Sequence, residues 1–216
     1  MEIIFCDNHV LIVSKPAGIS TQPHGRAGGE SDNLLDKAKA YLKKKFQKPG
    51  LVFLEPIHRL DTPVSGLVLF ARTSKALSRL QEQMRQKLIE KTYFAWVEGA
   101  LADDTGTLEH YLVHDEHKAR IVKEDHPMAK LARLHYEVID RQPKKSLVKI
   151  ILETGRYHQI RIQISTIGCP VIGDAKYGRS SLPPQGIALH HGPLKFTHPV
   201  TKEPLQFEKI PHYFSL

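Results

Sequence analysis

Asp61 is the residue whose neighbours give it the best opportunity for chemistry. It stands in EPIHRLDTPVSGLVLFAR, residues 55–72, between basic residues and a proline turn and directly before an apolar run. An aspartate near a proline is most often a turn or cap residue that accepts from backbone amides. Three features favour more than that here: Thr62 precedes the proline and is biased toward extended backbone, Gly66 permits close approach of another segment, and the apolar run predicts a partly desolvated wall.

A carboxylate in such a place needs a cationic partner to stay ionised. Arg59 and the arginines of GRYHQIR, residues 155–161, are the candidates. An ionised carboxylate can attack a sugar carbon, as in glycosidases, but those enzymes usually place a second acid nearby. No second carboxylate lies within HRLDTPVSG, so a sugar hydrolase that uses Asp61 is the weaker alternative.

Metal and disulfide chemistry have little support in the sequence. Cys6 and Cys169 are the two cysteines and have no paired spacing, which argues against a disulfide framework or a cysteine-based zinc site. The 13 histidines are scattered, and the pair His190 and His191 lacks the i, i+4 spacing of a helical zinc site. We therefore expect no metal site.

The overall charge favours a polyanionic partner. Lys and Arg total 31 against 23 Asp and Glu, which gives a net charge of +8, and an excess of this kind is typical of nucleic-acid-binding proteins and of some proteins without such a partner. Hydrophobic residues make up 41% of the chain, which is ordinary for a globular protein. No apolar run approaches the roughly 20 residues of a membrane span. The N-terminus carries an acid where a signal peptide would carry a basic residue, so we expect a cytoplasmic protein.

The segments around Asp61 predict the elements that position it. Residues 2–18 predict a hairpin of two short apolar strands around an Asp-Asn turn. GLVLFAR, after Asp61, predicts a buried strand, and the segment that follows it predicts an amphipathic helix capped by Thr73 or Ser74. The apolar side of that helix would contain Leu77, Leu80, Met84 and Leu88.

A further helix is predicted between the hairpin and Asp61. Ser31 and Asp32 are its candidate caps. Its apolar residues recur at helical spacing, at Leu34, Leu35, Ala38, Leu42 and Phe46.

The second half of the chain reads mainly as strands. KTYFAWVEG predicts a strand with Tyr93 on one face, and residues 101–130 are polar and irregular, which is typical of an exposed hairpin or loop. ARLHYEVIDR and SLVKIILETG alternate across a turn and predict a second hairpin. GRYHQIRIQISTIG predicts a short helix that ends at Gly168. Strands followed by single helices indicate an α+β fold with a largely antiparallel sheet in one domain, residues 1–216.

These stretches carry a resemblance to a known family. HRLDTPVSGLVLFA resembles the signature of the RluA-type pseudouridine synthases. DNHVLIVSKPAGIS resembles the opening hairpin of that family, KTYFAWVEG its tyrosine strand, TGRYHQIRIQISTIGCPVIGDAKYG its third motif, and LHHGPLKFTHPVTKEPLQF its closing strands. The resemblance covers nearly the whole chain in the expected order. It implies the pseudouridine synthase catalytic fold, a mixed, largely antiparallel bent β-sheet flanked by helices. Because the sequence starts directly at the catalytic hairpin, we expect no separate N-terminal RNA-binding domain of the kind that many members carry.

The resemblance also implies a reaction. A uridine within RNA is isomerised to pseudouridine: the N1 glycosidic bond breaks, the uracil turns over, and C5 bonds to the same ribose, without a cofactor. Asp61 matches the acid that acts on the sugar, either as a nucleophile at C1′ or through a glycal. Tyr93 matches the tyrosine that stacks on the base and helps to remove the C5 proton. Arg161 matches the arginine that pairs with the aspartate.

The expected partner is RNA, either ribosomal or transfer RNA, with the target uridine in a stem-loop. Arg59 matches a residue that contacts the flipped-out nucleotide, and we expect the other RNA-binding residues to be His58, Lys91, Arg156 and His158. A monomer is the expected state. The alternative from another class is a catalytically inactive RNA-binding paralogue of the same fold.

Two positions depart from the family pattern. Val64 replaces the usual Thr, so a hydrogen bond is lost while packing is kept. Tyr157 stands where Thr or Ser is common.

Overall fold

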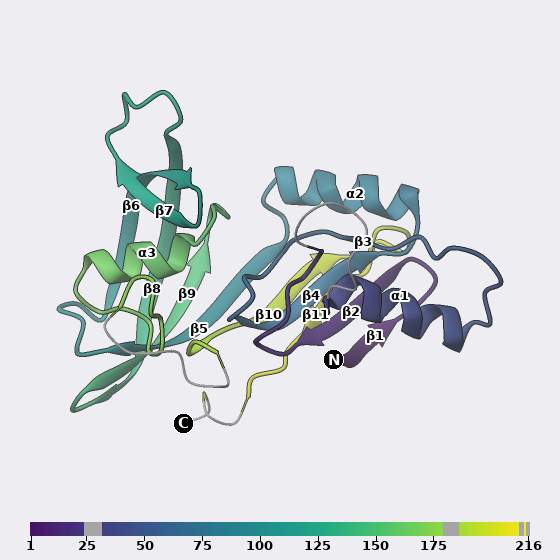
Figure 1. Ribbon diagram of the computed structural model, residues 1–216, viewed down its shortest axis with the longest axis horizontal. Coiled ribbons are helices and arrows are strands. Elements are labelled where there is room, and N and C mark those ends of the chain that lie inside the picture. Colours follow the sequence, from purple (N-terminus) through teal and green to yellow (C-terminus); the bar gives the residue numbers. More distant parts are fainter. Residues whose placement is uncertain (24–31, 179–185, 212–213, 215–216) are drawn as a thin grey trace. The chain divides into compact units, whose positions relative to one another are not determined.

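The computed structural model describes residues 1–23, 32–178, 186–211 and Phe214, and the chain divides into two compact units (Figure 1). The first unit consists of residues 1–90 and 191–209, and the second of residues 91–190 and 210–216. The first contains β1 Glu2–Cys6, β2 Val10–Lys15, α1 Leu34–Lys45, β3 Glu55–Pro56, β4 Ser65–Ala71, α2 Ser74–Arg85, most of β10 Leu189–Thr197, and β11 Pro204–Phe207. The second contains most of β5 Glu90–Glu98, together with β6 Thr105–Asp115, β7 Lys118–Val122, β8 Lys130–Gln142, β9 Lys145–Leu152 and α3 Gln159–Thr166.

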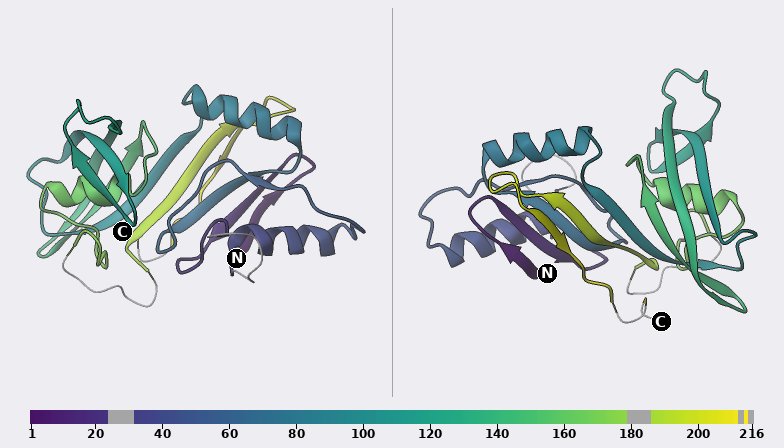
Figure 2. Two further views of the ribbon diagram at one scale, coloured as in Figure 1. Left: turned by 45° about the horizontal axis from the view of Figure 1, so that its top comes forward. Right: turned by 180° about the vertical axis from the view of Figure 1, so that it is seen from behind.

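The sheet of the first unit has its strands in the order β1-β2-β4-β10, with β3 on β4 and β11 on β10. β1 and β2 form the predicted hairpin, and β2 pairs antiparallel with β4. Alternate side chains of β2 and β4 point to opposite faces. One face, with Ile12 and Leu69, packs against Ala76 and Leu80 of α2, and α1 lies on the other face (Figures 1 and 2). Burial on both faces explains the apolar runs VLIV and GLVLFA.

The predicted cap of the first helix is wrong. The N-cap of α1 is Asn33, whose Oδ1 accepts from the N–H of Asp36 at 2.9 Å. Asn33 pairs with Ser20 in an isolated β-bridge, so the backbone stays extended through residue 33 and the helix begins after it. Asp32, a predicted cap, instead forms an ion pair with Lys37 at 2.6 Å. Ser31, the other one, lies outside the described residues.

The amphipathic helix α2 is confirmed, with Thr73 as its N-cap. Its apolar side is shorter than predicted, because the helix ends at Arg85 and Lys87 has a left-handed backbone with φ of 57°. Leu88 therefore lies beyond the helix and is 58% exposed.

Gly66, predicted to permit close approach, lies against the backbone of β10. A Cβ at this position would stand 2.3 Å from the carbonyl oxygen of His191 and 2.5 Å from its nitrogen. The φ of Gly66, +136°, is also one that other residues rarely adopt. The prediction made from the sequence is confirmed.

Gly66→Ala is therefore expected to destabilise the protein by more than about 4 kcal/mol, because neither backbone can move without breaking the sheet. The measurement is urea unfolding, with soluble yield where folding fails. Gly50→Ala is the matched control, because a Cβ at Gly50 meets nothing within 4 Å. Similar stability of the two variants would contradict the steric argument.

The second unit has its strands in the order β5-β9-β8-β6-β7, and each of the four pairings is antiparallel. Residues 101–130 contain a hairpin of β6 and β7, one of the two forms expected for them. The register places Tyr93 opposite Ile150, Ile150 opposite Tyr136 and Tyr136 opposite Gly106. Ala132 and Leu112 share this face by alternation and pack against α3. Tyr93 and α3 are thus on the same face of the sheet, and Figure 2 shows α3 lying along one face of these strands.

The α+β prediction with a largely antiparallel sheet is confirmed by these strands. The strand of Tyr93, the second hairpin and the short helix before Gly168 are also found as predicted. Among the residues that the structure describes, no helix is long and apolar enough to cross a membrane.

Candidate active site

Asp61 lies in a turn that leads into β4. Its carbonyl accepts from the N–H of Val64 at 3.0 Å, and its side chain is half-buried. Val64 is 3% exposed, so the methyl group that replaces a hydroxyl at this position is packed in the core. The Asp61 side chain is thus partly exposed to solvent, while Val64, at the other end of the turn, is anchored in the core.

Thr21 holds the backbone just before Asp61. The Thr21 hydroxyl donates to the carbonyl of Leu60 and accepts from the N–H of Leu60, each at 3.0 Å. The carbonyl of Thr62 accepts from the N–H of Gly18 at 2.8 Å. The segment after β2 therefore fixes the backbone on both sides of the carboxylate.

Lys15, at the end of β2, is a further member of this site that we did not predict. Its ammonium donates to three carbonyls, those of Pro16 at 3.0 Å, Ile19 at 2.8 Å and Thr62 at 3.2 Å, and the residue is 1% exposed. Burial lowers the pKa of Lys15 to about 8, and the Coulomb attraction of Asp61 opposes that shift. The signal in the sequence was a lysine at the end of a strand that begins with four apolar residues, in VLIVSKPAG.

The lowered pKa of Lys15 predicts a pH-dependent stability. Between about pH 8 and its ordinary pKa of 10.5 the folded state binds fewer protons here than the unfolded state. The contribution of Lys15 to the free energy of unfolding therefore rises with pH across this window, by up to about 3 kcal/mol, and is constant below it.

Urea unfolding of the wild type and of Lys15→Met is measured across this pH range. The effect is the change with pH in the difference between their free energies of unfolding. The exposed residue Lys44 supplies the control Lys44→Met. Parallel pH curves for the wild type and Lys15→Met would contradict a depressed pKa.

His58 and Arg59 flank the same turn in different ways. Arg59 is exposed, as a residue that contacts RNA must be. The His58 ring lies edge-on to the ring of His191 at 4.9 Å, and its Nε2 accepts from the N–H of Leu69 at 3.3 Å. These contacts tie His58 to the sheet. Its contact with RNA stays a prediction.

Tyr93, in the second unit, is a buried side chain of β5. It is 8% exposed and lies opposite Ile150 of β9. Its burial and its place on the α3 face restrict the orientation of the ring. Its catalytic role is not tested by these contacts and stays a prediction.

Arg161, on α3, forms a buried ion pair with Asp174. The Nε of Arg161 donates to Oδ2 of Asp174 at 2.6 Å and Nη2 donates to Oδ1 at 2.7 Å, with side chains 5% and 1% exposed. The Arg161 guanidinium also lies 5.3 Å from the centre of the Tyr177 ring. This bidentate geometry fixes the plane of the guanidinium. Asp174 was not among the predicted site residues, although it is the lone acid in GCPVIGDAKYG.

The position of Asp174 depends on pairing with β5. The N–H of Glu98 donates to the carbonyl of Pro170 at 2.8 Å, and the N–H of Ile172 donates to the carbonyl of Trp96 at 2.9 Å. The residues before Asp174 therefore run along β5, and the turn that follows brings the carboxylate to α3.

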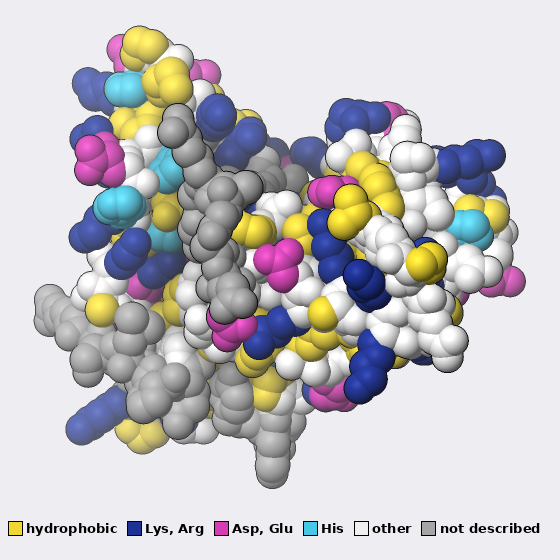
Figure 3. Space-filling model, turned by 45° about the vertical axis from the view of Figure 1, so that its right-hand side comes forward, with side chains coloured by type: hydrophobic (Ala, Val, Ile, Leu, Met, Phe, Trp, Pro, Cys, Tyr) yellow, Lys and Arg dark blue, Asp and Glu magenta, His cyan; other side chains and the backbone are white. Residues whose placement is uncertain are grey.

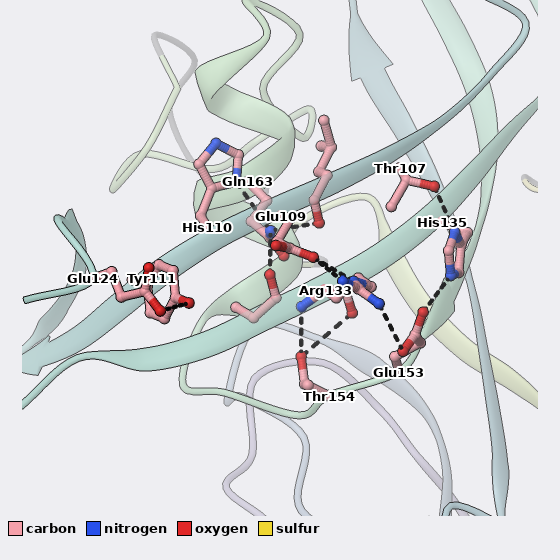
Figure 4. Close-up of polar contacts among 12 residues, drawn as sticks. Thr107, Glu109, His110, Tyr111, Glu124, Arg133, His135, Glu153, Thr154 and Gln163 are labelled. Carbon is pink, nitrogen blue, oxygen red and sulfur yellow. Dashed lines mark hydrogen bonds and ion pairs between the residues drawn. The ribbon is translucent and has the colours of Figure 1, made fainter.

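Gln163 anchors α3 to the sheet (Figure 4). Its Nε2 donates to the carbonyls of Leu108 at 3.0 Å and Ala132 at 3.1 Å, and lies 3.1 Å from Nδ1 of His110. A fully buried amide with these acceptors resists any shift of the helix. The helix that carries Arg161 is thus held at its middle.

Gln159 closes the loop before α3. Its Oε1 accepts from the Thr154 hydroxyl at 2.8 Å and from the N–H of Arg156 at 3.0 Å, and its Nε2 donates to the carbonyl of Arg133 at 3.1 Å. His158 then takes a left-handed backbone, with φ of 54°, and the helix begins. The chain from residue 154 to 158 is therefore tightly constrained.

Three predicted RNA-binding residues meet at this loop. Arg156 is exposed and its Nε donates to the carbonyl of Leu131 at 2.8 Å, while the Nζ of Lys91 lies 3.3 Å from the Cβ position of Gly155. Burial lowers the pKa of Lys91. His158 is 6% exposed and its Nδ1 lies 2.8 Å from the hydroxyl of Tyr177. This burial favours a supporting part for His158, and its contact with RNA stays a prediction.

The opposite face of this sheet carries a separate polar network (Figure 4). His135 links the hydroxyl of Thr107 and the carboxylate of Glu153, each at 2.7 Å, and Arg133 forms an ion pair with Glu109. These side chains are partly exposed, and such ion pairs contribute little to stability. They point away from the face of Tyr93, and we assign them to the pairing of β6, β8 and β9.

The surface charge agrees with an anionic partner. Lys and Arg side chains are prominent on the face shown in Figure 3. Among the described residues, no group of three His, Cys, Asp or Glu side chains could hold a metal ion.

Comparison with known proteins gives matches over most of the chain. The family model described as RNA pseudouridylate synthase matches residues 9–166. The uncharacterized RNA pseudouridine synthase YhcT of Bacillus subtilis (strain 168) is 35% identical over 207 residues, which cover 94% of this chain and 66% of that protein. The dual-specificity RNA pseudouridine synthase RluA of Haemophilus influenzae is 33% identical over 210 residues, 96% of this chain and 91% of that protein. The fold is similar to that of human RNA Pseudouridylate Synthase Domain Containing 4, with a TM-score of 0.79, 22% identity and coverage of 99% and 90% of the two chains.

Proposed function

The chain belongs to the RNA pseudouridylate synthase family, and from this premise we propose that it isomerises uridine to pseudouridine in ribosomal or transfer RNA, with Asp61 acting on the ribose. The observation that carries the proposal is that the matched residues 9–166 contain Asp61, Tyr93 and Arg161, each within the motif where the family places that function. The retention of all three favours an active enzyme over an RNA-binding paralogue.

The chemistry requires a carboxylate that reaches the sugar. Along one route Asp61 attacks C1′ as the N1 glycosidic bond breaks, the uracil rotates, and C5 displaces the carboxylate. Along the other, Asp61 removes the C2′ proton as uracil departs and a glycal forms, and that proton returns to C2′ when C5 bonds to C1′. In both routes C5 loses a proton and N1 gains one, so the product is an isomer of the substrate and no co-reactant is consumed.

Lys15 and the hydrogen bonds of Thr21 to the Leu60 backbone support this role of Asp61. A cation within Coulombic range favours the ionised carboxylate, and backbone contacts on both sides of the residue reduce the movement needed to reach the reacting geometry. Residues of the first unit thus keep the Asp61 carboxylate ionised and its backbone in place, as attack on an electrophilic carbon requires.

Tyr93 and Arg161 supply the remaining functions in this proposal. The Tyr93 ring stacks on the target base, and its hydroxyl helps to remove the C5 proton. Arg161 pairs with Asp61 in this proposal, and Asp174 holds the Nε and Nη2 of the same guanidinium. The geometry of that buried pair supports a fixed orientation for the arginine.

RNA is held by basic residues around these groups. Arg59 contributes from the first unit, and Lys91 and Arg156 contribute from the second. A base in a loop is easier to unpair than a base in a helix, which favours a stem-loop target. A monomer suffices for this arrangement.

The test is product analysis with purified protein and unmodified ribosomal and transfer RNA transcripts. Because one relative is named for dual specificity, both RNA classes are offered separately. Pseudouridine at a defined uridine supports the proposal. Free uracil would indicate a hydrolase, and RNA binding without either product would indicate an inactive paralogue.

A further inference from the structure

Three aromatic rings form a stack beside the loop that precedes α3. Tyr157 lies 3.8 Å from His158, centre to centre, with an interplanar angle of 20°. His114 of β6 lies 4.0 Å from the Tyr157 ring at an angle of 43°. His158 is buried, Tyr157 is 36% exposed and His114 is exposed, so the stack runs from the interior to solvent.

The inner end of this stack is rigidly held. The Tyr177 hydroxyl accepts from the N–H of Ala119 at 2.6 Å and lies 2.8 Å from Nδ1 of His158, within hydrogen-bond distance. Burial and the nearby Arg161 lower the pKa of His158 to about 3, and burial raises the pKa of Tyr177 to about 12. Both rings are therefore neutral at physiological pH, and His158 presents a fixed face to Tyr157.

The outer end is also positioned by the fold. Nε2 of His114 lies 3.0 Å from the carbonyl of Glu116, in the turn of the β6–β7 hairpin. The Nζ of Lys176 donates to the carbonyl of His117 in the same turn at 2.7 Å. The hairpin and the chain after α3 thus hold His114 beside Tyr157.

The charges next to the stack are mixed, with exposed cations both in the loop and near the hairpin turn. Arg156 precedes Tyr157 and is exposed, and Lys176 and Lys118 are exposed near the hairpin turn. Glu116 lies in that turn, and Asp115, the last residue of β6, is paired with Arg120 at 2.7 Å. An aromatic surface bordered by lysine and arginine suits a nucleobase whose phosphate lies on the basic side.

We propose that His114 and Tyr157 form a stacking platform for a base of the bound RNA, with the base on the outer face of His114 and Tyr157 supporting that ring from behind. The proposal rests on the proposed function, since it assigns part of the RNA to this surface. Stacking is tolerant of base identity because every base has a π-face. The platform therefore contributes affinity and fixes the path of the RNA, and it takes no part in bond breaking.

Binding is measured in the Asp61→Asn background, so that the result does not depend on turnover. The probe is a hairpin RNA with one uridine in its loop. Tyr157→Ala is expected to weaken binding about five-fold or more, whereas Tyr157→Phe keeps the ring and stays within about two-fold. His114→Ala is expected to weaken binding as well. Phe53→Ala, at an exposed ring in the other unit, is the matched control and is expected to have no effect.

Direct stacking is tested by a double-mutant cycle with the RNA. Each loop nucleotide other than the uridine is replaced in turn by an abasic nucleotide. At the stacked position, the abasic change is expected to weaken RNA binding by the protein that retains Tyr157. The same change is expected to have little effect on RNA binding by the Tyr157→Ala variant. Thermal unfolding confirms that each variant is folded.

The proposal would be overturned if Tyr157→Ala and the abasic change had additive effects on binding at every loop position. Unchanged binding by a folded Tyr157→Ala variant would overturn it as well. That outcome is distinct from failure of the proposed function, which the product analysis reports with Asp61 intact.

Discussion

Asp61→Asn is expected to abolish pseudouridine formation while RNA affinity stays within about ten-fold of the wild type. The amide has nearly the same shape as the carboxylate, so the turn and the RNA surface are kept. It cannot serve as a nucleophile toward C1′ or carry the negative charge that a glycal route requires. The measurement is single-turnover product formation together with direct binding of the same RNA.

The control for this prediction is Asp125→Asn, which makes the same chemical change at an exposed residue outside the proposed site. Its turnover is expected to match the wild type. Sustained product formation by Asp61→Asn would refute the proposed role. Loss of binding together with turnover would instead make Asp61 a structural residue.

Asp174→Ala is expected to lower the free energy of unfolding by about 3–5 kcal/mol, because it leaves the buried Arg161 guanidinium without the carboxylate that holds two of its donors. Replacing both partners, as in Arg161→Met with Asp174→Leu, removes the uncompensated charge. The double variant is therefore expected to recover most of the stability lost by Asp174→Ala. Urea unfolding of the single and double variants measures both effects.

The double variant also separates stability from catalysis at Arg161. If Arg161 pairs with Asp61 during the reaction, a stable double variant still loses turnover, while RNA affinity changes less. Full turnover by the folded double variant would limit Arg161 to a structural role. Equal stability of Asp174→Ala and the wild type would contradict the energetic argument from burial.

Local pattern in the sequence was enough to predict most of the elements. Burial on one side of α2 leaves a helical periodicity, and burial on both sides of β4 leaves an unbroken apolar run; both can be read without a structure. The cap of α1 could not be assigned in this way. Ser31, Asp32 and Asn33 are all good cap residues, and the β-bridge between Asn33 and Ser20 decided among them.

The sequence by itself determined the family, because the residues proposed for chemistry occur in continuous motifs, with Asp61 in HRLD and Arg161 in HQIR. It also predicted that Gly66 permits close approach. Only the tertiary structure identified the segment that Gly66 approaches, which is more than a hundred residues away in the chain at His191.

Only the tertiary structure decided how the proposed site residues are supported. Asp174 reaches Arg161 because residues 170–172 pair with β5, and Lys15 reaches the Thr62 carbonyl because β2 and β4 are paired in that register. His114 reaches Tyr157 through the β6–β7 hairpin. The physical reason is common to all of them. Ion pairs, buried ammonium groups and ring stacks depend on distances between residues far apart in the chain, and such contacts leave no period or spacing in the sequence from which they could be predicted.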